Sequence, residues 1–191
     1  DNTRIVTASA DGSAKVWDAS TSAELLPLNG HIDEVLHAAW SSDDARIVTA
    51  SRDGSAKVWD ASTGAELFTL SGHTNGIQYA AWSSDDMRIL TASWDGSAKV
   101  WDATTGEELF TLSGHTDGVL HAAWSSDDAR IVTASADTGA RTHFAQIDGL
   151  GGLIEFACAR AGRNMTLDEW ERYVGYDVGY QKTCPNLREE R

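Results

Sequence analysis

Three kinds of side chain that together build hydrolase triads recur in this sequence at one fixed spacing: a histidine, a threonine and an aspartate. The first set is His31, Thr49 and Asp53. The same spacing gives two further sets: His73, Thr91 and Asp95, then His115, Thr133 and Asp137. An imidazole held by a carboxylate can activate a hydroxyl as a nucleophile. Because a catalytic site needs one copy in one cleft, three copies in register favour a packing role, and we predict no enzymatic activity.

These sets belong to a repeat of 42 residues that is nearly identical from copy to copy. Each copy contains one arginine at the same position: Arg4, Arg46, Arg88 and Arg130. In the second copy, four short runs of apolar and β-forming residues cover 37–41, 46–51, 56–60 and 66–71. Turn-forming residues separate the runs, and Asp53-Gly54 suits a tight hairpin that requires positive φ. The repeat therefore predicts four antiparallel strands per copy and an all-β fold.

The repeat resembles the WD-repeat family, which carries Gly-His before its first strand and Trp-Asp at the end of its third. The matching dipeptides are Gly30-His31, Gly72-His73, Gly114-His115, Trp17-Asp18, Trp59-Asp60 and Trp101-Asp102. The resemblance covers residues 1–140 and implies a β-propeller, whose rings contain about 4–8 blades. It also implies that each His–Thr–Asp set forms a hydrogen-bonded tetrad with a tryptophan. That residue is Trp59 in the second copy and Trp101 in the third, whereas His143 stands at this position in the fourth.

Composition excludes several classes of partner. The 191 residues include 29 acidic and 15 basic ones, a net charge of −14, whereas nucleic-acid binding requires clustered Lys and Arg. No apolar run approaches the ~20 residues of a membrane helix. We expect no metal or cofactor, because no Cys/His cluster has zinc spacing and the repeated pairs such as Asp43-Asp44 fit solvated turns better than calcium loops. The two cysteines suit a reducing compartment, so we predict a cytoplasmic protein.

The few differences between copies are the best candidates for partner binding. The position before the turn aspartate is Arg52 in the second copy and Trp94 in the third. Arg and Trp are enriched at binding hot spots, and these two could stack as cation and ring. By resemblance to WD-repeat proteins, they lie on the top face around the central channel, with four other variable positions: Glu34, Leu36, Gln78 and Leu120. We predict that this face docks a protein or peptide; neutral drift at exposed positions is the alternative.

Residues 148–191 depart from the repeat and divide the chain into a propeller part, 1–147, and a second module. Helical spacing in 153–162 and a capping box at 166–169 predict a small helical cap. The module resembles the tail that follows WD repeats in large bacterial proteins; a peptide-binding or oligomerising helix pair is the alternative. It contains Cys158 and Cys184, either as reduced thiols or as a bridge.

Three full periods and a broken fourth leave two interpretations of the ring. Either the chain is the C-terminal piece of a longer propeller, which we favour, or two copies combine into a ring of about eight blades. The first predicts an interaction scaffold or sensor domain, by resemblance the recognition part of a bacterial signalling protein. The second predicts a structural, self-assembling homodimer with no other partner.

Overall fold

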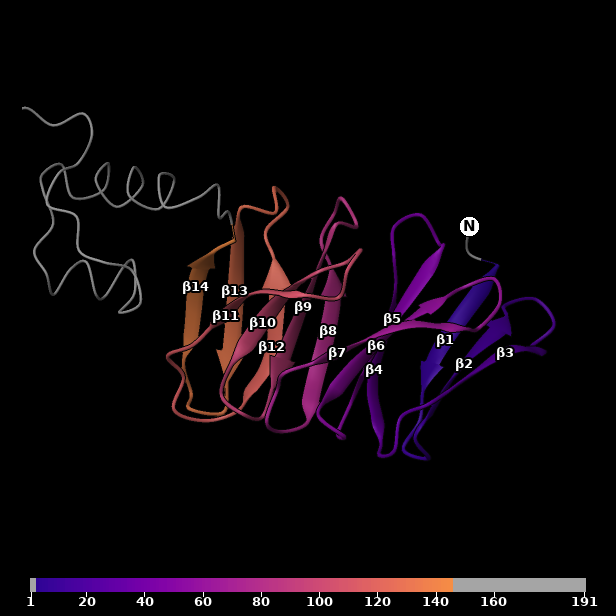
Figure 1. Cartoon of the computed structure of the whole chain (residues 1–191), viewed down its shortest axis with the longest axis horizontal. Helices are drawn as coiled ribbons and strands as arrows, with labels where there is room; N and C mark the ends of the chain where they lie inside the picture. The colour runs from indigo at the N-terminus through magenta and orange to yellow at the C-terminus, as the bar shows by residue number, and fades with distance from the viewer. Residues whose placement is uncertain (1–2, 146–191) are drawn as a thin grey trace, which may run out of the picture. The chain divides into compact units, whose positions relative to one another are not determined.

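The computed structural model describes residues 3–145, and every regular element in that range is a β-strand. The strands form four antiparallel sheets that follow one another along the chain (Figure 1). The all-β fold predicted from the repeat is therefore confirmed. The chain separates into two compact units, Asp1–His143 and Phe144–Arg191. The predicted helical cap, with Cys158 and Cys184, lies outside the described residues.

Each sheet follows the chain order of its strands. The first sheet contains β1 (Arg4–Ala8), β2 (Ser13–Asp18) and β3 (Glu24–Asn29). The second contains β4 (Val35–Trp40), β5 (Arg46–Ser51), β6 (Ser55–Asp60) and β7 (Glu66–Ser71). The third contains β8 (Ile77–Trp82), β9 (Arg88–Ser93), β10 (Ala98–Asp102) and β11 (Glu108–Leu112). The fourth contains β12 (Val119–Trp124), β13 (Arg130–Ser135) and β14 (Ala140–Phe144).

In the second sheet β5 and β7 match the predicted runs, β6 begins one residue earlier, and β4 is displaced toward the N-terminus. Strand β4 begins earlier than predicted, because Val35 pairs with Ser51 before a β-bulge and His37 pairs with Ala50 after it. Leu36 is therefore the extra residue of the bulge. No helix long and apolar enough to span a membrane occurs in residues 3–145.

The predicted hairpin turns depend on a backbone that favours glycine. Gly12, Gly54 and Gly96 adopt φ of 84°, 84° and 86° in the first three sheets, a conformation that glycine reaches without steric cost. In the fourth sheet Thr138 takes this place with φ of 67°. A β-branched residue is strained there, so the last turn is the least favourable of the four.

The core lies between neighbouring sheets. Trp59 of β6 packs against Val16 and Leu28 of the first sheet. Trp101 of β10 packs in the same way against the second sheet, where it meets Val58. Each sheet buries a face against the next. The tryptophan of the repeat therefore packs between two sheets and contributes to the core that they share. This packing positions the His–Thr–Asp sets.

Candidate functional site

The second sheet joins its predicted set into one hydrogen-bonded chain. His31 Nδ1 lies 2.8 Å from Asp53 Oδ2, and His31 Nε2 lies 2.8 Å from Thr49 Oγ1. Trp59 Nε1 donates to the same Thr49 oxygen at 2.9 Å. Since the carboxylate can only accept, Nδ1 carries the proton and Nε2 accepts from the threonine hydroxyl. The donor and the acceptor of each hydrogen bond among these four residues are therefore determined.

The third sheet repeats this arrangement. His73 lies 2.7 Å from Asp95 through Nδ1 and 2.8 Å from Thr91 through Nε2. Trp101 Nε1 donates to Thr91 at 2.8 Å. The geometry of the two sheets agrees within 0.1 Å at every bond, as expected of a repeated packing device.

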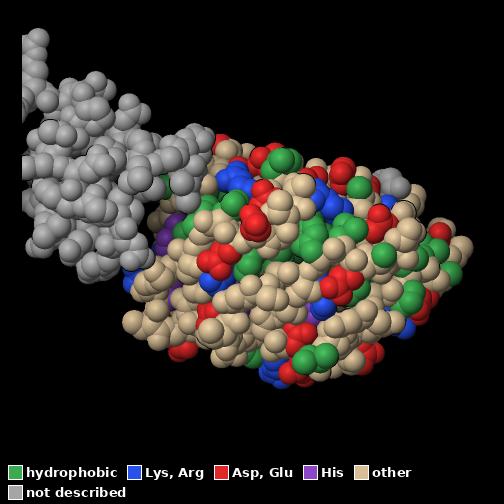
Figure 2. Space-filling model, viewed as in Figure 1, with side chains coloured by type: hydrophobic (Ala, Val, Ile, Leu, Met, Phe, Trp, Pro, Cys, Tyr) green, Lys and Arg blue, Asp and Glu red, His purple; other side chains and the backbone are tan. Residues whose placement is uncertain are grey.

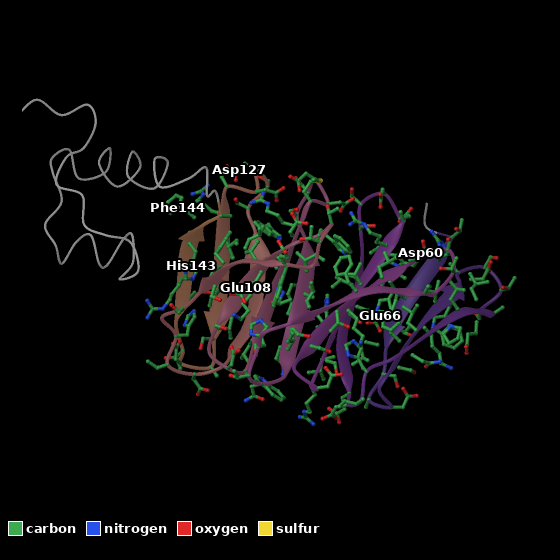
Figure 3. All side chains as sticks on the ribbon, viewed as in Figure 1. Asp60, Glu66, Glu108, Asp127, His143 and Phe144 are labelled. Carbon is green, nitrogen blue, oxygen red and sulfur yellow. The ribbon has the colours of Figure 1, made fainter. Side chains whose placement is uncertain are left out.

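The fourth sheet replaces the tryptophan with a titratable side chain. His115 lies 2.8 Å from Asp137 and 2.9 Å from Thr133. His143, which Figure 3 labels on β14, lies with its Nε2 3.1 Å from the Thr133 hydroxyl. Burial lowers the pKa of His143, and the nearby His115 and Arg141 lower it further. In its neutral Nε2–H form, His143 keeps the donor that the indole supplies in the other sheets.

Burial decides against a catalytic role for these sets. The threonines at the centre of each network are fully buried: Thr49 and Thr91 are 0% exposed and Thr133 is 1% exposed. A nucleophile must reach its substrate, and these threonines have almost no exposed surface. Their donors and acceptors are also fully paired with one another, which fixes a unique packing of buried polar groups. The sets therefore have the geometry of a packing network of buried polar groups.

The networks make the stability of the protein depend on pH. Burial lowers the pKa of His31 and His73 below the ordinary 6.5, although their aspartate partners oppose this. Near and below pH 6.5 the unfolded chain therefore binds more protons than the folded chain. We expect the free energy of unfolding to decrease as the pH is lowered from 7.5 to about 5.5. Burial raises the pKa of Asp53 and Asp95, but hydrogen bonds from serine and histidine outweigh it and lower both to about 2. Their contribution is complete above 3.8 and is lost as the pH falls toward 2.

Urea unfolding midpoints measured from pH 7.5 to 2.5 test this expectation. The double variant His31→Asn/His73→Asn is the matched control, because it removes two histidines whose pKa differs between the folded and unfolded chains. The variant should have a shallower slope above pH 5, with a remainder from His37 and His143, whose pKa burial also lowers. A midpoint that stays constant from pH 7.5 to 5.5 in the wild type would contradict the expectation.

Neighbouring sheets are tied together by the arginine of the repeat. Arg46 lies over the ring of Trp82 in the third sheet, 4.6 Å from its centroid. Its guanidinium also donates to two backbone oxygens of that sheet, those of Ala103 at 2.6 Å and Asp86 at 2.9 Å. Arg4 makes the same contacts with the second sheet. Each interface thus combines a cation–π contact with fixed hydrogen bonds.

One aspartate in two of the three repeated pairs corrects the prediction of solvated turns. Asp86 and Asp128 are buried. The Asp86 carboxylate accepts from the backbone and the hydroxyl of Ser42, at 2.9 and 2.6 Å, and Asp128 accepts from Ser84 in the same way. These residues join the turn of one sheet to the turn of the preceding sheet. Half of the repeated acidic positions in these two turns are thus structural, which the pattern Asp-Asp did not indicate.

The structure brings Arg52 and Trp94 together on the rim that carries the hairpin turns. The Arg52 guanidinium lies over the Trp94 ring, 5.1 Å from its centroid, so the predicted stacking of cation and ring is present. Arg52 also forms an ion pair of 2.9 Å with Glu34. Trp94 is half-buried, and the positions where a Cβ would stand on Gly76 and Gly118 lie 3.4 and 3.0 Å from its ring. The ring therefore spans the loops of the third and fourth sheets.

The remaining variable positions lie at equivalent bulges. Leu36, Gln78 and Leu120 are the extra residues where β4, β8 and β12 each skip one position of their register. Leu120 is exposed, and the other two are half-buried. We define the rim positions as the six residues predicted to bind a partner: Glu34, Leu36, Arg52, Gln78, Trp94 and Leu120.

Sequence reasoning did not identify a column of rings next to these bulges. His37 stacks on Tyr79 with 4.2 Å between ring centroids, and Tyr79 stacks on His121 at 4.0 Å. All three residues share one position of the repeat, which was the available signal. Within residues 3–145, no group of three side chains is placed to hold a metal ion. The column therefore gives no support for a metal site.

Comparison with known protein families accounts for the repeat. A family model described as WD domain, G-beta repeat matches residues 1–18, 23–60, 64–102 and 106–141. The matched segments cover more than half of the chain and include the three complete His–Thr–Asp sets. A comparison with curated proteins finds no match.

Proposed function

Because the chain belongs to the WD domain, G-beta repeat family, we propose that it is a non-enzymatic scaffold or sensor domain that docks a protein or peptide on the rim around Trp94. Repeats of this family are generally protein–protein interaction scaffolds. The proposal includes a cytoplasmic location and a signalling role. The proposed domain uses no metal or cofactor. Nucleic acid is a poor partner for it, because the chain has a net charge of −14.

The observation that carries the proposal is the placement of Trp94. The repeat fixes almost every other tryptophan of the described residues between sheets, but Trp94 stands at a position that is Ala10 in the first copy and Ala136 in the fourth. Packing therefore does not require a large ring there. A partly exposed tryptophan next to an arginine has the residue types that are enriched at binding hot spots.

We expect Trp94→Ala to weaken partner binding about thirtyfold, the ratio that corresponds to a hot spot of about 2 kcal/mol. The variant is to be compared with the wild type by affinity capture from an extract of the source organism, with captured proteins quantified by mass spectrometry. Leu67→Ala is the control, since Leu67 is an exposed apolar residue that lies on strand β7, away from the Trp94 turn. Urea unfolding would show that both variants are folded. A Trp94→Ala protein that keeps every partner would overturn the proposal.

Self-assembly is the second candidate function, supported by the two outermost sheet faces of the described residues. Ile5 and Val132 are 51% and 45% exposed. The equivalent Ile47 and Val48 are fully buried between sheets. Apolar positions of this kind could be covered by a second copy in a homodimer that completes a ring. Light scattering over a range of concentrations separates the two functions, because a dimer that binds no other partner favours assembly.

A further inference from the structure

The chain contains four arginine–tryptophan contacts within the described residues, and three of them are equivalent. The three equivalent pairs are Arg4 with Trp40, Arg46 with Trp82 and Arg88 with Trp124, each with 4.6 Å between the guanidinium carbon and the ring centroid. Each arginine also donates to backbone oxygen of the next sheet. A guanidinium group that left its ring would therefore also lose hydrogen bonds to the backbone of the next sheet.

The fourth contact, between Arg52 and Trp94, is held much more weakly. The guanidinium lies farther from the ring, at 5.1 Å. Its polar partner is Glu34, at 2.9 Å, and the two side chains are 44% and 34% exposed. An ion pair this exposed adds little to stability, because water and salt screen it. Arg52 can therefore leave the Trp94 ring at small cost, while its backbone stays in the hairpin turn.

In the copies that flank Trp94, the positions equivalent to Glu34 and Arg52 carry small residues. In the third and fourth copies the position of Glu34 is taken by Gly76 and Gly118, and the position of Arg52 is taken in the fourth copy by Ala136. None of these residues has a side chain that could cover an indole ring. Trp94 is thus the only large side chain at these positions in the third and fourth copies.

The charge around this ring favours a cation. Arg52 is the only basic residue among the six rim positions, and Glu34 neutralises it. The neighbouring loops carry Asp33 and Asp117, both exposed, next to Glu34 and Gly118 respectively. Acidic side chains are also spread over the face of the sheets drawn in Figure 2. A protein of net charge −14 attracts basic partners before contact is made.

We propose that Trp94 receives an arginine side chain of a basic peptide partner, and that Arg52 is an internal occupant that the partner's guanidinium displaces. Arg52 shows that a guanidinium fits over this ring, because it occupies that place in the free protein. The incoming cation takes over the contact with the ring face and lies near Glu34, while Arg52 turns to solvent. The inference rests on the proposed function and names the chemistry of the partner.

If the partner's arginine displaces Arg52, truncating the Arg52 side chain should raise the affinity for the peptide, whereas truncation of an interface residue usually lowers it. Removing Arg52 takes away the competitor and one positive charge, so Arg52→Ala should bind a basic peptide about five- to tenfold more tightly than the wild type. Trp94→Ala should bind it at least tenfold more weakly. A partner that uses the Arg52–Trp94 pair as one platform for an apolar side chain gives the contrary result, since Arg52→Ala then weakens binding.

The experiment is an NMR titration of the ¹⁵N-labelled full chain with the capped pentapeptide Leu-Arg-Leu-Arg-Leu and with its counterpart in which citrulline replaces both arginines. Trp94→Phe identifies the Trp94 indole resonance, and the titration yields the dissociation constant for the wild type, Arg52→Ala and Trp94→Ala. We expect the arginine peptide to shift this resonance, and the neutral citrulline peptide to bind at least tenfold more weakly to Arg52→Ala. The inference is overturned if citrulline binds equally well, if Arg52→Ala binds no more tightly than the wild type, or if no variant binds the arginine peptide.

These outcomes are distinct from failure of the proposed function. If Trp94→Ala loses captured partners but the arginine peptide does not respond to Arg52→Ala, docking on the rim stands and the cationic chemistry is wrong. If Trp94→Ala retains all captured partners, docking at Trp94 is wrong whatever the peptide does.

Discussion

We expect Trp101→Ala to lower the free energy of unfolding by about 3–5 kcal/mol. The Trp101 ring is 1% exposed and fills the core between the second and third sheets. Alanine leaves a cavity that the flanking strands cannot close, because both sheets are held by their own ladders. It also removes the Nε1–H donor to the buried Thr91 hydroxyl. Since a domain has about 5–15 kcal/mol of stability, urea unfolding followed by circular dichroism should show a large shift of the midpoint.

The repeat supplies a matched control for this substitution. Trp17 has the same position in the first sheet and makes the same hydrogen bond, at 2.8 Å to Thr7. It is only half-buried, because no described sheet packs on its outer side. Trp17→Ala should therefore cost about 1 kcal/mol. Trp101→Phe, which keeps a ring but no donor, should fall between the two and remain measurable if the alanine variant does not fold. Equal losses of unfolding free energy in Trp17→Ala and Trp101→Ala would contradict the conclusion that Trp101 is stabilised by packing between two sheets.

The repeat made most of the fold predictable, because each copy tests the assignment of the others. Alternation of apolar and turn residues located β5 and β7 to the residue, and the recurring Asp-Gly marked the hairpins. The limit was the start of β4, since a β-bulge breaks the alternation at Leu36. The extra residue shifts the alternation by one position, so the residues before the bulge no longer fit the pattern of the residues after it.

Contacts between sheets were harder to predict than contacts within a sheet. Asp85 and Asp86 are neighbouring aspartates of one turn, but Asp85 is exposed and Asp86 is buried. They differ in backbone: Asp86 has φ of 56°, which turns its carboxylate toward Ser42 of the preceding sheet. The sequence contains no signal for this difference. In contrast, the stacking of Arg52 on Trp94 was predictable, because two unusual residues at one repeat position must lie on adjacent blades.

The repeated His–Thr–Asp sets show why repetition is evidence about mechanism. A triad and a packing network use the same donors and acceptors, so distances alone do not separate them. Burial does, because Thr49 and Thr91 have no exposed surface. The indole of Trp59 or Trp101 then completes a chain in which every buried donor has one acceptor. Removing the first acceptor of such a chain should disturb all of its members.

We expect Asp95→Ala to lower the free energy of unfolding by about 3 kcal/mol. Asp95 accepts hydrogen bonds from His73 Nδ1, the Thr74 backbone and the backbone and hydroxyl of Ser97. Alanine removes the close acceptor of the buried His73 Nδ1–H and leaves only the Ser97 hydroxyl, at 3.4 Å. If His73 changes tautomer to avoid this, its Nε2–H and the Trp101 indole both donate to the Thr91 oxygen. The threonine hydroxyl must then direct its own hydrogen elsewhere.

Asp11→Ala is the control, because Asp11 occupies the same turn of the first sheet and accepts from the backbone and hydroxyl of Ser13, but no histidine pairs with it within the described residues. We expect it to cost less than about 1 kcal/mol. Asp95→Asn keeps one carbonyl oxygen, which can satisfy His73 or Ser97 but not both, and should lose roughly half of the alanine effect. Urea midpoints at pH 7.5 measure all three, and the Trp101 indole NMR resonance reports the network directly. If Asp95→Ala and Asp11→Ala cost the same, the aspartate serves only its local turn, and the proton order of the tetrad does not stabilise the sheets.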